Sequence, residues 1–347
     1  MDIGTSIVVW FIHSVVLAVV LATGFAYTTL LERRVIARFQ ARVGPNRAGP
    51  QGLLQPLADG VKLIFKEEVT PARADKATFI IAPILAAIPA FVVFAVIPFG
   101  GTINLFGAQI PLTLAPDLNV GVLYVLAITS ISVYGIVLAG WASNSKYSML
   151  GGLRSSAQMI SYELAMGLSL VALVVVAGTL NMNAIVEQQK QVWFFFLQPV
   201  GALIFMITAL AEVNRAPFDM PEAEQELTSG YNTEYSGMKF ALFFLAEYIK
   251  MIVISALSVT FFFGGYREPL PLFVTQALPI LSVDNSPALG PIYFAIKIIL
   301  LLIVQVWVRA TLPRFRYDRL MQFGWKVLLP LSLGWVMVTA LVVLLRG

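Results

Sequence analysis

The stretch SIVVWFIHSVVLAVVLATGFAYTTLL, residues 6–31, contains no Asp, Glu, Lys or Arg. It is longer than the roughly 20 apolar residues that a helix needs to cross the hydrocarbon layer of a bilayer. No basic region precedes it, and it is too long for the apolar core of a signal peptide. We therefore expect it to be retained as a transmembrane helix.

The composition of the whole chain agrees with this expectation. Of its 347 residues, 59% are hydrophobic and 12% are charged, whereas soluble domains are about 25% charged. A soluble globular protein, a disordered chain and a fibrous protein are thereby excluded. We predict an all-α polytopic membrane protein with a single integral membrane domain over residues 1–347. Its eight expected spans lie at about residues 6–31, 79–98, 118–140, 157–177, 192–212, 240–263, 291–310 and 326–345. Two shorter apolar stretches, 53–65 and 270–283, are more typical of amphipathic or interfacial segments.

The distribution of basic residues predicts the orientation. Eighteen of the 23 Lys and Arg residues lie in or beside the loops that follow the odd-numbered spans, 32–78, 141–156, 213–239 and 311–325. The opposite side holds Lys190, Arg267 and Arg346. The positive-inside rule then places those four loops in the cytoplasm and both termini on the other side. Topology explains the net charge of +4, and we expect no nucleic-acid partner.

The residue inventory excludes several kinds of redox site. The chain has no cysteine and one histidine, His13, so iron–sulfur ligation, a bis-histidine haem and a multi-histidine zinc site cannot be built from it. We expect no metal site. If the chain takes part in redox chemistry, another subunit must deliver the electrons.

The first cytoplasmic loop contains LERRVIARFQARVGPNRAGPQGLLQPLADGVKLIFKEE, residues 31–68. Its Gly-Pro pairs end the first helical run. Apolar residues at helical spacing then resume from Leu53, with Asp59, Lys62 and Lys66 on the other side, which is typical of a helix lying along a membrane surface or a partner. A basic loop that only holds anionic lipid is the alternative.

The third cytoplasmic loop is acidic where a basic loop is expected. AEVNRAPFDMPEAEQELTSGYNTEYSGM, residues 211–238, holds six of the 19 acids. Capping of a helix beginning near Pro221 would account for Asp219 and Glu222. Capping does not require Glu212, Glu224 and Glu226, and we therefore favour a functional role.

Ionisable residues within the spans are the sharper signal, because an unpaired charge at the bilayer centre costs at least ~2.5–3.5 kcal/mol. They are Glu163, Glu247, Lys250 and Lys297. Glu163, Glu247 and Glu212 would reach one cytoplasmic half-layer from three helices, and Glu247 could pair with Lys250 on one helix face. Burial brings carboxyl groups into the range of proton exchange near neutral pH. We favour a proton path over a set of satisfied ion pairs.

Five segments together resemble a known family: residues 31–68 above, GWASNSKY (140–147), AQMISYE (157–163), EVNRAPFDMPEAEQEL (212–227) and RATLPRFRYDRLM (309–321). They resemble, in order, the H-type subunit of the proton-translocating NADH:quinone oxidoreductase, respiratory complex I, the family of the mitochondrially encoded first core membrane subunit. The likeness covers residues 31–330. Val213, Gln225 and Arg319 stand where Thr, Ser and Gln are common in that family. These three differences remove no acid from the expected path. A hydrogen bond from a Thr hydroxyl at position 213 is lost, because Val213 has none.

The resemblance implies a membrane-arm subunit that forms part of a quinone chamber and couples quinone reduction to proton translocation. It implies quinone as substrate, with FMN and iron–sulfur clusters in partner subunits of the peripheral arm, other membrane-arm subunits as neighbours, and surrounding lipid. Residues expected to line the quinone passage are Arg33, Arg42, Asp59, Lys62 and Arg215. The expected proton-coupling acids are Glu212, Asp219, Glu222, Glu224, Glu226, Glu163 and Glu247, with Tyr162, Lys146 and Tyr248 as secondary candidates.

Other interpretations remain open from sequence. A homologous component of a membrane-bound hydrogenase, a stand-alone ion transporter using Glu163, Glu247, Lys250 and Lys297, and a purely structural anchor for the peripheral arm are the alternatives. The long basic loop facing an acidic one argues against a transporter. We favour ubiquinone over menaquinone, and a bacterial inner membrane over a mitochondrial one.

Overall fold

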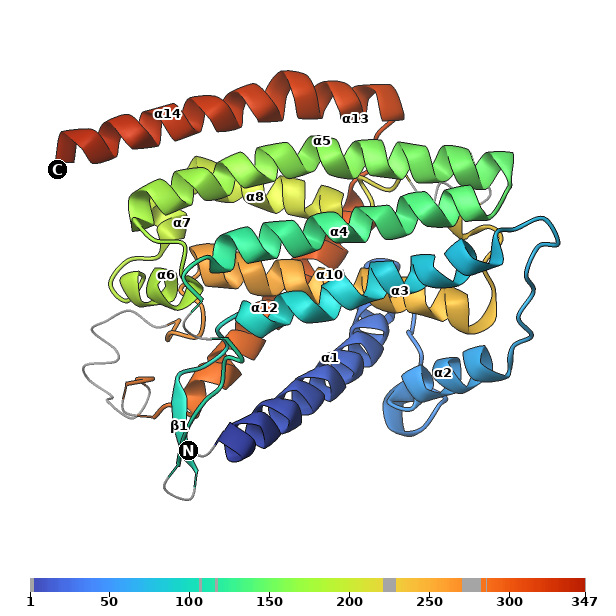
Figure 1. The fold of residues 1–347 in the computed structure, drawn as a ribbon, viewed down its shortest axis with the longest axis horizontal. Coiled ribbons are helices and arrows are strands. Elements are labelled where there is room, and N and C mark those ends of the chain that lie inside the picture. The colour runs from blue at the N-terminus through green and yellow to red at the C-terminus, as the bar shows by residue number, and fades with distance from the viewer. Residues whose placement is uncertain are drawn as a thin grey trace.

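The computed structural model describes residues 3–105, 108–115, 118–220, 229–269, 282–284 and 286–346. Most of its long helices run roughly alongside one another, α1 and α12 run obliquely to them, and α14 lies on the outside of the bundle (Figure 1). The α-helices are α1 (Ile3–Phe39), α2 (Gln55–Phe65), α3 (Lys76–Val92), α4 (Gly121–Ala142), α5 (Lys146–Ala177), α6 (Met182–Gln188), α7 (Phe194–Leu197), α8 (Pro199–Glu212), α10 (Gly237–Phe262), α12 (Leu289–Thr311), α13 (Tyr317–Phe323) and α14 (Leu329–Arg346). Short 3-10 helices η1 (Pro50–Gly52), η2 (Val93–Val96) and η3 (Gly230–Asn232), and the π-helix η5 (Gly324–Leu328), complete the helical set.

The predicted class of polytopic helical membrane protein is confirmed. Seven helices in the described part of the chain are long and apolar enough to cross a membrane, and the shorter apolar helix α8 coincides with the remaining expected span. One element was not anticipated. The strands β1 (Thr102–Leu105) and β2 (Ala108–Pro111) form an antiparallel hairpin between α3 and α4, with Thr102 opposite Pro111.

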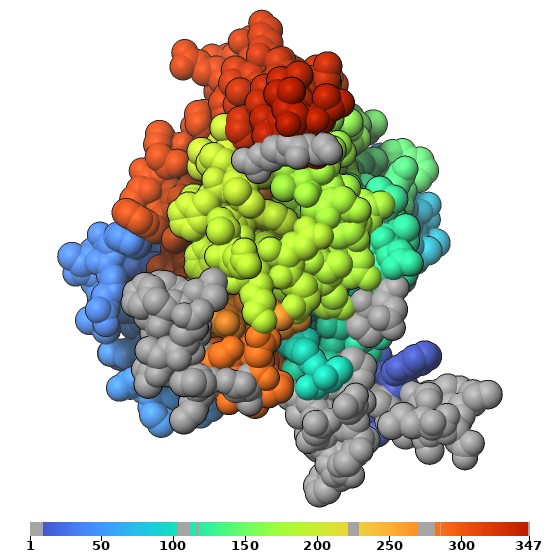
Figure 2. Space-filling view, turned by 90° about the vertical axis from the view of Figure 1, so that its left-hand side faces the viewer, coloured from blue at the N-terminus to red at the C-terminus, as the bar shows by residue number. Residues whose placement is uncertain are grey.

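The bundle has two distinct ends. We call one the hairpin end, because it carries β1 and β2 together with α6, α7 and both chain termini (Figure 1). Figure 2 looks onto this end, where the yellow-green surface of α6 and α7 lies near the middle and α14 projects at the top. The other, the α2 end, carries α2, α13 and the turns that join α4 to α5 and α8 to α10. The predicted cytoplasmic loops all meet at the α2 end, while the side of the membrane on which it lies stays a prediction.

Helix α5 begins earlier than the sequence indicated. Residues 146–156 were expected in a loop, but they form its first three turns. The cause is close packing of small residues: a Cβ on Gly140 of α4 would lie 2.6 Å from the Ser148 carbonyl oxygen of α5. Gly and Ser permit such an approach between membrane helices, and the packing outweighs their low helix propensity. The expected amphipathic helix at 53–65 is present as α2, whereas most of the stretch at 270–283 lies outside the described residues.

The core lies where α4, α5, α8 and α10 meet. Fully buried aromatic and aliphatic side chains fill it, among them Phe205, Phe261, Phe262, Leu170 and Leu173. The outward faces of α1, α12 and α14 carry exposed apolar residues such as Trp10, Trp307 and Leu341. Apolar surface of this kind is stable in lipid, and it leaves the polar side chains to gather inside the α2 end.

Candidate functional site

Arg215 is the centre of a buried ion network at the α2 end. It follows α8 and is 5% exposed. Its guanidinium pairs with Glu247 of α10 and lies 3.5 Å from Glu32 Oε1 of α1. The ring of Tyr248 lies 4.5 Å from the guanidinium carbon and covers one of its faces. A buried charge is tolerated only with such partners, so this one side chain ties the turn after α8 to two transmembrane helices.

Glu32 brings a second cation into the network. Its carboxylate, which is 4% exposed, also pairs with Arg309 of α12. The network therefore runs Arg309–Glu32–Arg215–Glu247, with two acids and two bases drawn from four segments of the chain. Sequence reasoning missed Glu32 and Arg309, because Glu32 is the first charged residue beyond an apolar window and Arg309 lies beside a loop that is basic throughout. Their positions at the ends of uncharged spans were the available signal.

Lys250 extends the site toward the middle of the bundle. It lines one small cavity with Glu247 and Asn214, and a second one with Glu212 and Thr129. Its ammonium interacts electrostatically with Glu212, Glu163 and Glu247. We expected Lys250 to pair with Glu247 along α10. Instead, Glu247 has Arg215 as its ion-pair partner, and Lys250 is placed between Glu247 and Glu212.

Two carboxyl groups lie beyond Lys250. Glu212 ends α8 and is 3% exposed, and within the described part of the chain no donor reaches its Oε2 atom. Glu163 of α5 is half-buried and accepts a hydrogen bond from the Ser130 hydroxyl of α4. The three acids predicted to reach one half-layer, Glu247, Glu212 and Glu163, are thus gathered around one lysine. Ser130 was not predicted as part of this group.

Gln158 holds the turn that presents Arg215. Its side chain is fully buried, and its amide nitrogen donates to the carbonyl oxygens of Ala211 at 2.8 Å and Phe218 at 2.6 Å, with Asn214 Oδ1 at 3.2 Å. These acceptors flank Arg215 on both sides along the chain. Because buried carbonyls need donors, Gln158 fixes the turn between α8 and the acidic segment. This residue too was missed as a site residue.

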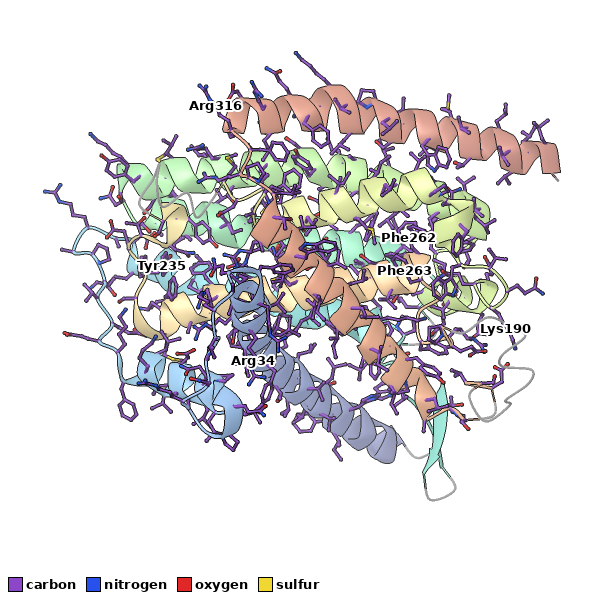
Figure 3. All side chains as sticks on the ribbon, turned by 180° about the vertical axis from the view of Figure 1, so that it is seen from behind. Arg34, Lys190, Tyr235, Phe262, Phe263 and Arg316 are labelled. Atoms are coloured by element: carbon purple, nitrogen blue, oxygen red, sulfur yellow. The ribbon has the colours of Figure 1, made fainter. Side chains whose placement is uncertain are left out.

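The expected quinone-passage residues divide into two groups. Arg33 of α1 pairs with Asp59 of α2 at 2.7 Å, and Gln55 also donates to Asp59 at 3.2 Å. The Arg33–Asp59 pair holds α2 against α1, while the Gln55 bond lies within α2, the pale blue helix beside the labelled Arg34 in Figure 3. Arg42 and Lys62 are exposed and do not join the Arg215 network. Arg42 instead donates to the Gln40 side chain at 2.7 Å.

The remaining candidates differ in how far the structure places them. Asp219 is half-buried in the turn after α8. Glu222, Glu224 and Glu226, like Gln225, lie outside the described residues. Of the secondary candidates, Tyr162 is buried and donates to the Leu320 carbonyl at 3.0 Å, Tyr248 covers Arg215, and Lys146 is exposed away from the network.

This arrangement suits charge and proton movement. Alternating cations and carboxylates on α1, α10, α12 and the turn after α8 can change partners without moving a helix, and a change at Arg215 alters the field at Glu247 directly. In the described ranges, no group of three or more His, Asp or Glu side chains is placed to hold a metal ion.

Comparison with known proteins identifies close relatives. Residues 12–340 match the family described as NADH dehydrogenase. An H-type subunit of NADH-quinone oxidoreductase from Geobacter sulfurreducens is 52% identical over 333 residues, which cover 93% of this chain and 91% of that protein. The H-type subunit of NADH-quinone oxidoreductase from Protochlamydia amoebophila is 51% identical over 318 residues, covering 92% of each chain.

Proposed function

The chain belongs to the NADH dehydrogenase family, as an H-type membrane subunit of respiratory complex I, and from this premise we propose that it couples quinone reduction to proton translocation. In this proposal it forms part of the quinone chamber at the α2 end. The carboxyl groups around Arg215 and Lys250 pass the effect of quinone reduction into the membrane arm. The chain supplies no redox centre, so the electrons arrive from partner subunits.

The observation that carries the proposal is the placement of Arg215. It contacts Glu32 on α1, beside the Arg33–Asp59 contact that anchors α2, and Glu247 on α10. A quinone headgroup that changes charge or takes up protons near α1 and α2 would change the relative strength of the two ion pairs that Arg215 makes, with Glu32 and with Glu247. Glu247 then alters the field at Lys250, and through it at Glu212 and Glu163.

Each proposed role follows from position. Arg33 and Asp59 hold the wall of the passage between α1 and α2, while Arg42 and Lys62 supply positive charge at its exposed rim. Asp219, Glu222, Glu224 and Glu226 form the acidic segment that leads toward Glu212. This assignment of the acidic segment rests on the sequence alone.

The partners and location follow from the family. We propose that the α2 end docks beneath the peripheral-arm subunits that carry FMN and iron–sulfur clusters, with other membrane-arm subunits and lipid around the spans. The quinone is proposed to be ubiquinone and the membrane the bacterial inner membrane. The names of the relatives favour a quinone enzyme over a hydrogenase-type complex.

The test uses the intact complex in inner membranes carrying Glu247→Gln or Glu212→Gln. NADH oxidation is followed with an artificial acceptor that takes electrons from the flavin, then with quinone, alongside proton pumping. We expect artificial-acceptor activity to stay normal. The rates of quinone reduction and of proton pumping should both fall by about tenfold or more. Glu67→Gln, an exposed acid at the same end, is the matched control. Full quinone reduction and pumping in both buried-site variants would contradict the proposal.

A further inference from the structure

Lys297 of α12 lies near the hairpin end, far from the Arg215 network along the bundle, and it is 7% exposed. Its ammonium donates to three main-chain carbonyl oxygens, those of Phe263 at 2.7 Å, Gly265 at 2.9 Å and Arg267 at 2.8 Å. An ammonium group has three donors, so all of them are used. The ring of Trp193 lies 5.2 Å from the nitrogen. We call this arrangement the lysine clasp.

The clasp closes the end of α10. The three carbonyls belong to the C-cap residue Phe263 and to the turn that follows it, and the partial negative charge at the C-terminal end of a helix favours a cation there. Directly after α10, Gly264 and Gly265 have positive φ values of 73° and 52°, which turn the chain back over the end of the helix. A Cβ on Gly265 would lie 2.5 Å from a methyl group of Val186. The segment is thus shaped to aim its carbonyls at Lys297.

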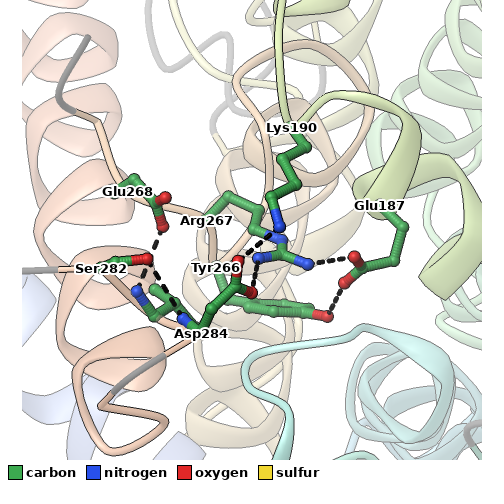
Figure 4. Close-up of polar contacts among 8 residues, drawn as sticks. Glu187, Lys190, Tyr266, Arg267, Glu268, Ser282 and Asp284 are labelled. Atoms are coloured by element: carbon green, nitrogen blue, oxygen red, sulfur yellow. Dashed lines mark hydrogen bonds and ion pairs between the residues drawn. The ribbon is translucent and has the colours of Figure 1, made fainter. Parts of the chain in front are cut away.

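A second set of hydrogen bonds and ion pairs holds the same segment, which follows α10. Gln189 donates to the Thr260 carbonyl at 2.9 Å and accepts from the Gly264 amide at 3.0 Å. The Arg267 guanidinium pairs with Glu187 and Asp284, and Lys190 also pairs with Asp284 (Figure 4). This outer ion cluster is partly exposed, whereas the clasp beneath it is buried.

We infer that the ring of carbonyls at the end of α10 is a site for a monovalent cation, which the chain fills with its own ammonium. Carbonyl oxygens arranged in this way replace the hydration shell of an ion. Lys297 is therefore a positioning residue, since all three of its N–H donors are used and losing a proton would leave one of the three carbonyls without a donor. In the stand-alone transporter interpretation, Lys297 takes part in moving ions. A lysine whose three donors are all held by carbonyl oxygens does not fit that role.

The clasp positions the proton-coupling residues through α10. Lys250 and Glu247 lie 12 and 15 residues before the end of that helix, which at 1.5 Å per residue is about 18 and 23 Å. A helix packed on several sides transmits an axial shift with little loss. The clasp therefore sets the depth at which Glu247 meets Arg215. This role rests on the proposed function.

The test exploits the space that a truncated lysine leaves. In purified complex, Lys297→Ala and Lys297→Met are compared for quinone reduction, with artificial-acceptor activity measuring the amount of intact enzyme. We expect both to lose about tenfold or more of the wild-type rate. Added propylammonium should restore Lys297→Ala but not Lys297→Met, whose side chain fills the cavity. Tetramethylammonium, which has no N–H donor, should restore neither.

Lys297→Gln covers the case in which the alanine variant fails to assemble. Its amide can donate two hydrogen bonds but carries no charge, so we expect assembly with fewer charges moved per NADH oxidised in proteoliposomes. Lys190→Met, which removes an exposed lysine of the outer ion cluster, should behave as wild type. Three results would each overturn the inference. They are wild-type coupling in Lys297→Gln, wild-type rates in Lys297→Met, and failure of propylammonium to restore an assembled Lys297→Ala.

Glu247→Gln is assayed beside these variants. If Glu247→Gln loses quinone-linked pumping while the Lys297 variants keep it, the clasp inference is wrong and the proposed function stands. If Glu247→Gln and Glu212→Gln both keep it, the proposed function fails, whichever way Lys297 behaves.

Discussion

Glu32 and Arg309 form an ion pair across 277 positions of the chain, and this pair joins α1 to α12 at the α2 end. Glu32 also faces Arg215, so its carboxylate is shared by two guanidinium groups. The contact places α12 at one end of the network. It therefore gives a direct test of how the buried network contributes to stability.

We predict that Glu32→Gln destabilises the folded protein by about 3–5 kcal/mol, because it leaves buried Arg215 and half-buried Arg309 without their shared carboxylate. Arg309→Gln should cost less, since Arg215 still pairs with Glu32. The midpoint of heat inactivation of the complex measures both. Asp318→Asn is the control: its pair with Arg316 at 2.9 Å is exposed, and such pairs contribute ~0–1 kcal/mol. Equal effects at Glu32 and Asp318 would contradict the prediction.

Gln158→Leu tests whether the turn after α8 must be held in place. Removing the amide leaves buried carbonyls without a donor and frees the segment that presents Arg215. We expect quinone reduction to fall by about tenfold, with artificial-acceptor activity retained. Gln158→Glu should be at least as severe, because a carboxylate would face carbonyl oxygens.

Gln188→Leu is the matched control for Gln158. Gln188 makes a similar bond, to the Ala177 carbonyl at 2.8 Å, but at the hairpin end. Its loss should leave quinone reduction unchanged. If Gln188→Leu and Gln158→Leu have the same effect, Gln158 contributes only to general stability.

Much of the architecture could be predicted from hydropathy. The uncharged stretch at 6–31 and windows like it locate the long helices, because a helix that crosses a bilayer needs an apolar segment of about 20 residues. The acids at positions 163, 212 and 247 stand out for the same reason, since charge is rare in such windows. These residues are indeed close together in the structure, although their roles stay a prediction.

What the sequence could not supply is the pairing between distant segments. Glu247 and Lys250 are near neighbours on one helix, so local reasoning paired them, whereas the fold brings Arg215 to Glu247 from another segment. Lys297 stood out from sequence only as an ionisable residue within a span. Its partners are backbone carbonyls, which no side-chain pattern reveals.

Ser130→Ala tests the contact between α4 and α5. The Ser130 hydroxyl donates to Glu163, and hydrogen bonds to a carboxylate contribute about 1.5–3 kcal/mol. We expect proton pumping to slow by a factor of about 3 to 10, with flavin-linked activity unchanged. Ser132→Ala is the control, since that hydroxyl donates only to the Thr129 carbonyl of its own helix at 2.7 Å. A full pumping rate in Ser130→Ala would show that Glu163 does not depend on this hydroxyl.

The outer ion cluster should make a small, pH-dependent contribution to the free energy of unfolding at the hairpin end. Hydrogen bonds from Lys190 and then Arg267 hold the pKa of Asp284 below its usual range. A folded-state pKa below the unfolded value of ~3.9 means that the stabilisation is present above that pH and is lost as pH falls through the folded value. Because Asp284 is 45% exposed, solvent screening limits the contribution to less than ~1 kcal/mol. Asp284→Asn should therefore lower the heat-inactivation midpoint slightly at pH ~6, and the difference from wild type should disappear in acid. A difference that persists unchanged below pH ~3 would mean that Asp284 acts through packing and not through its charge.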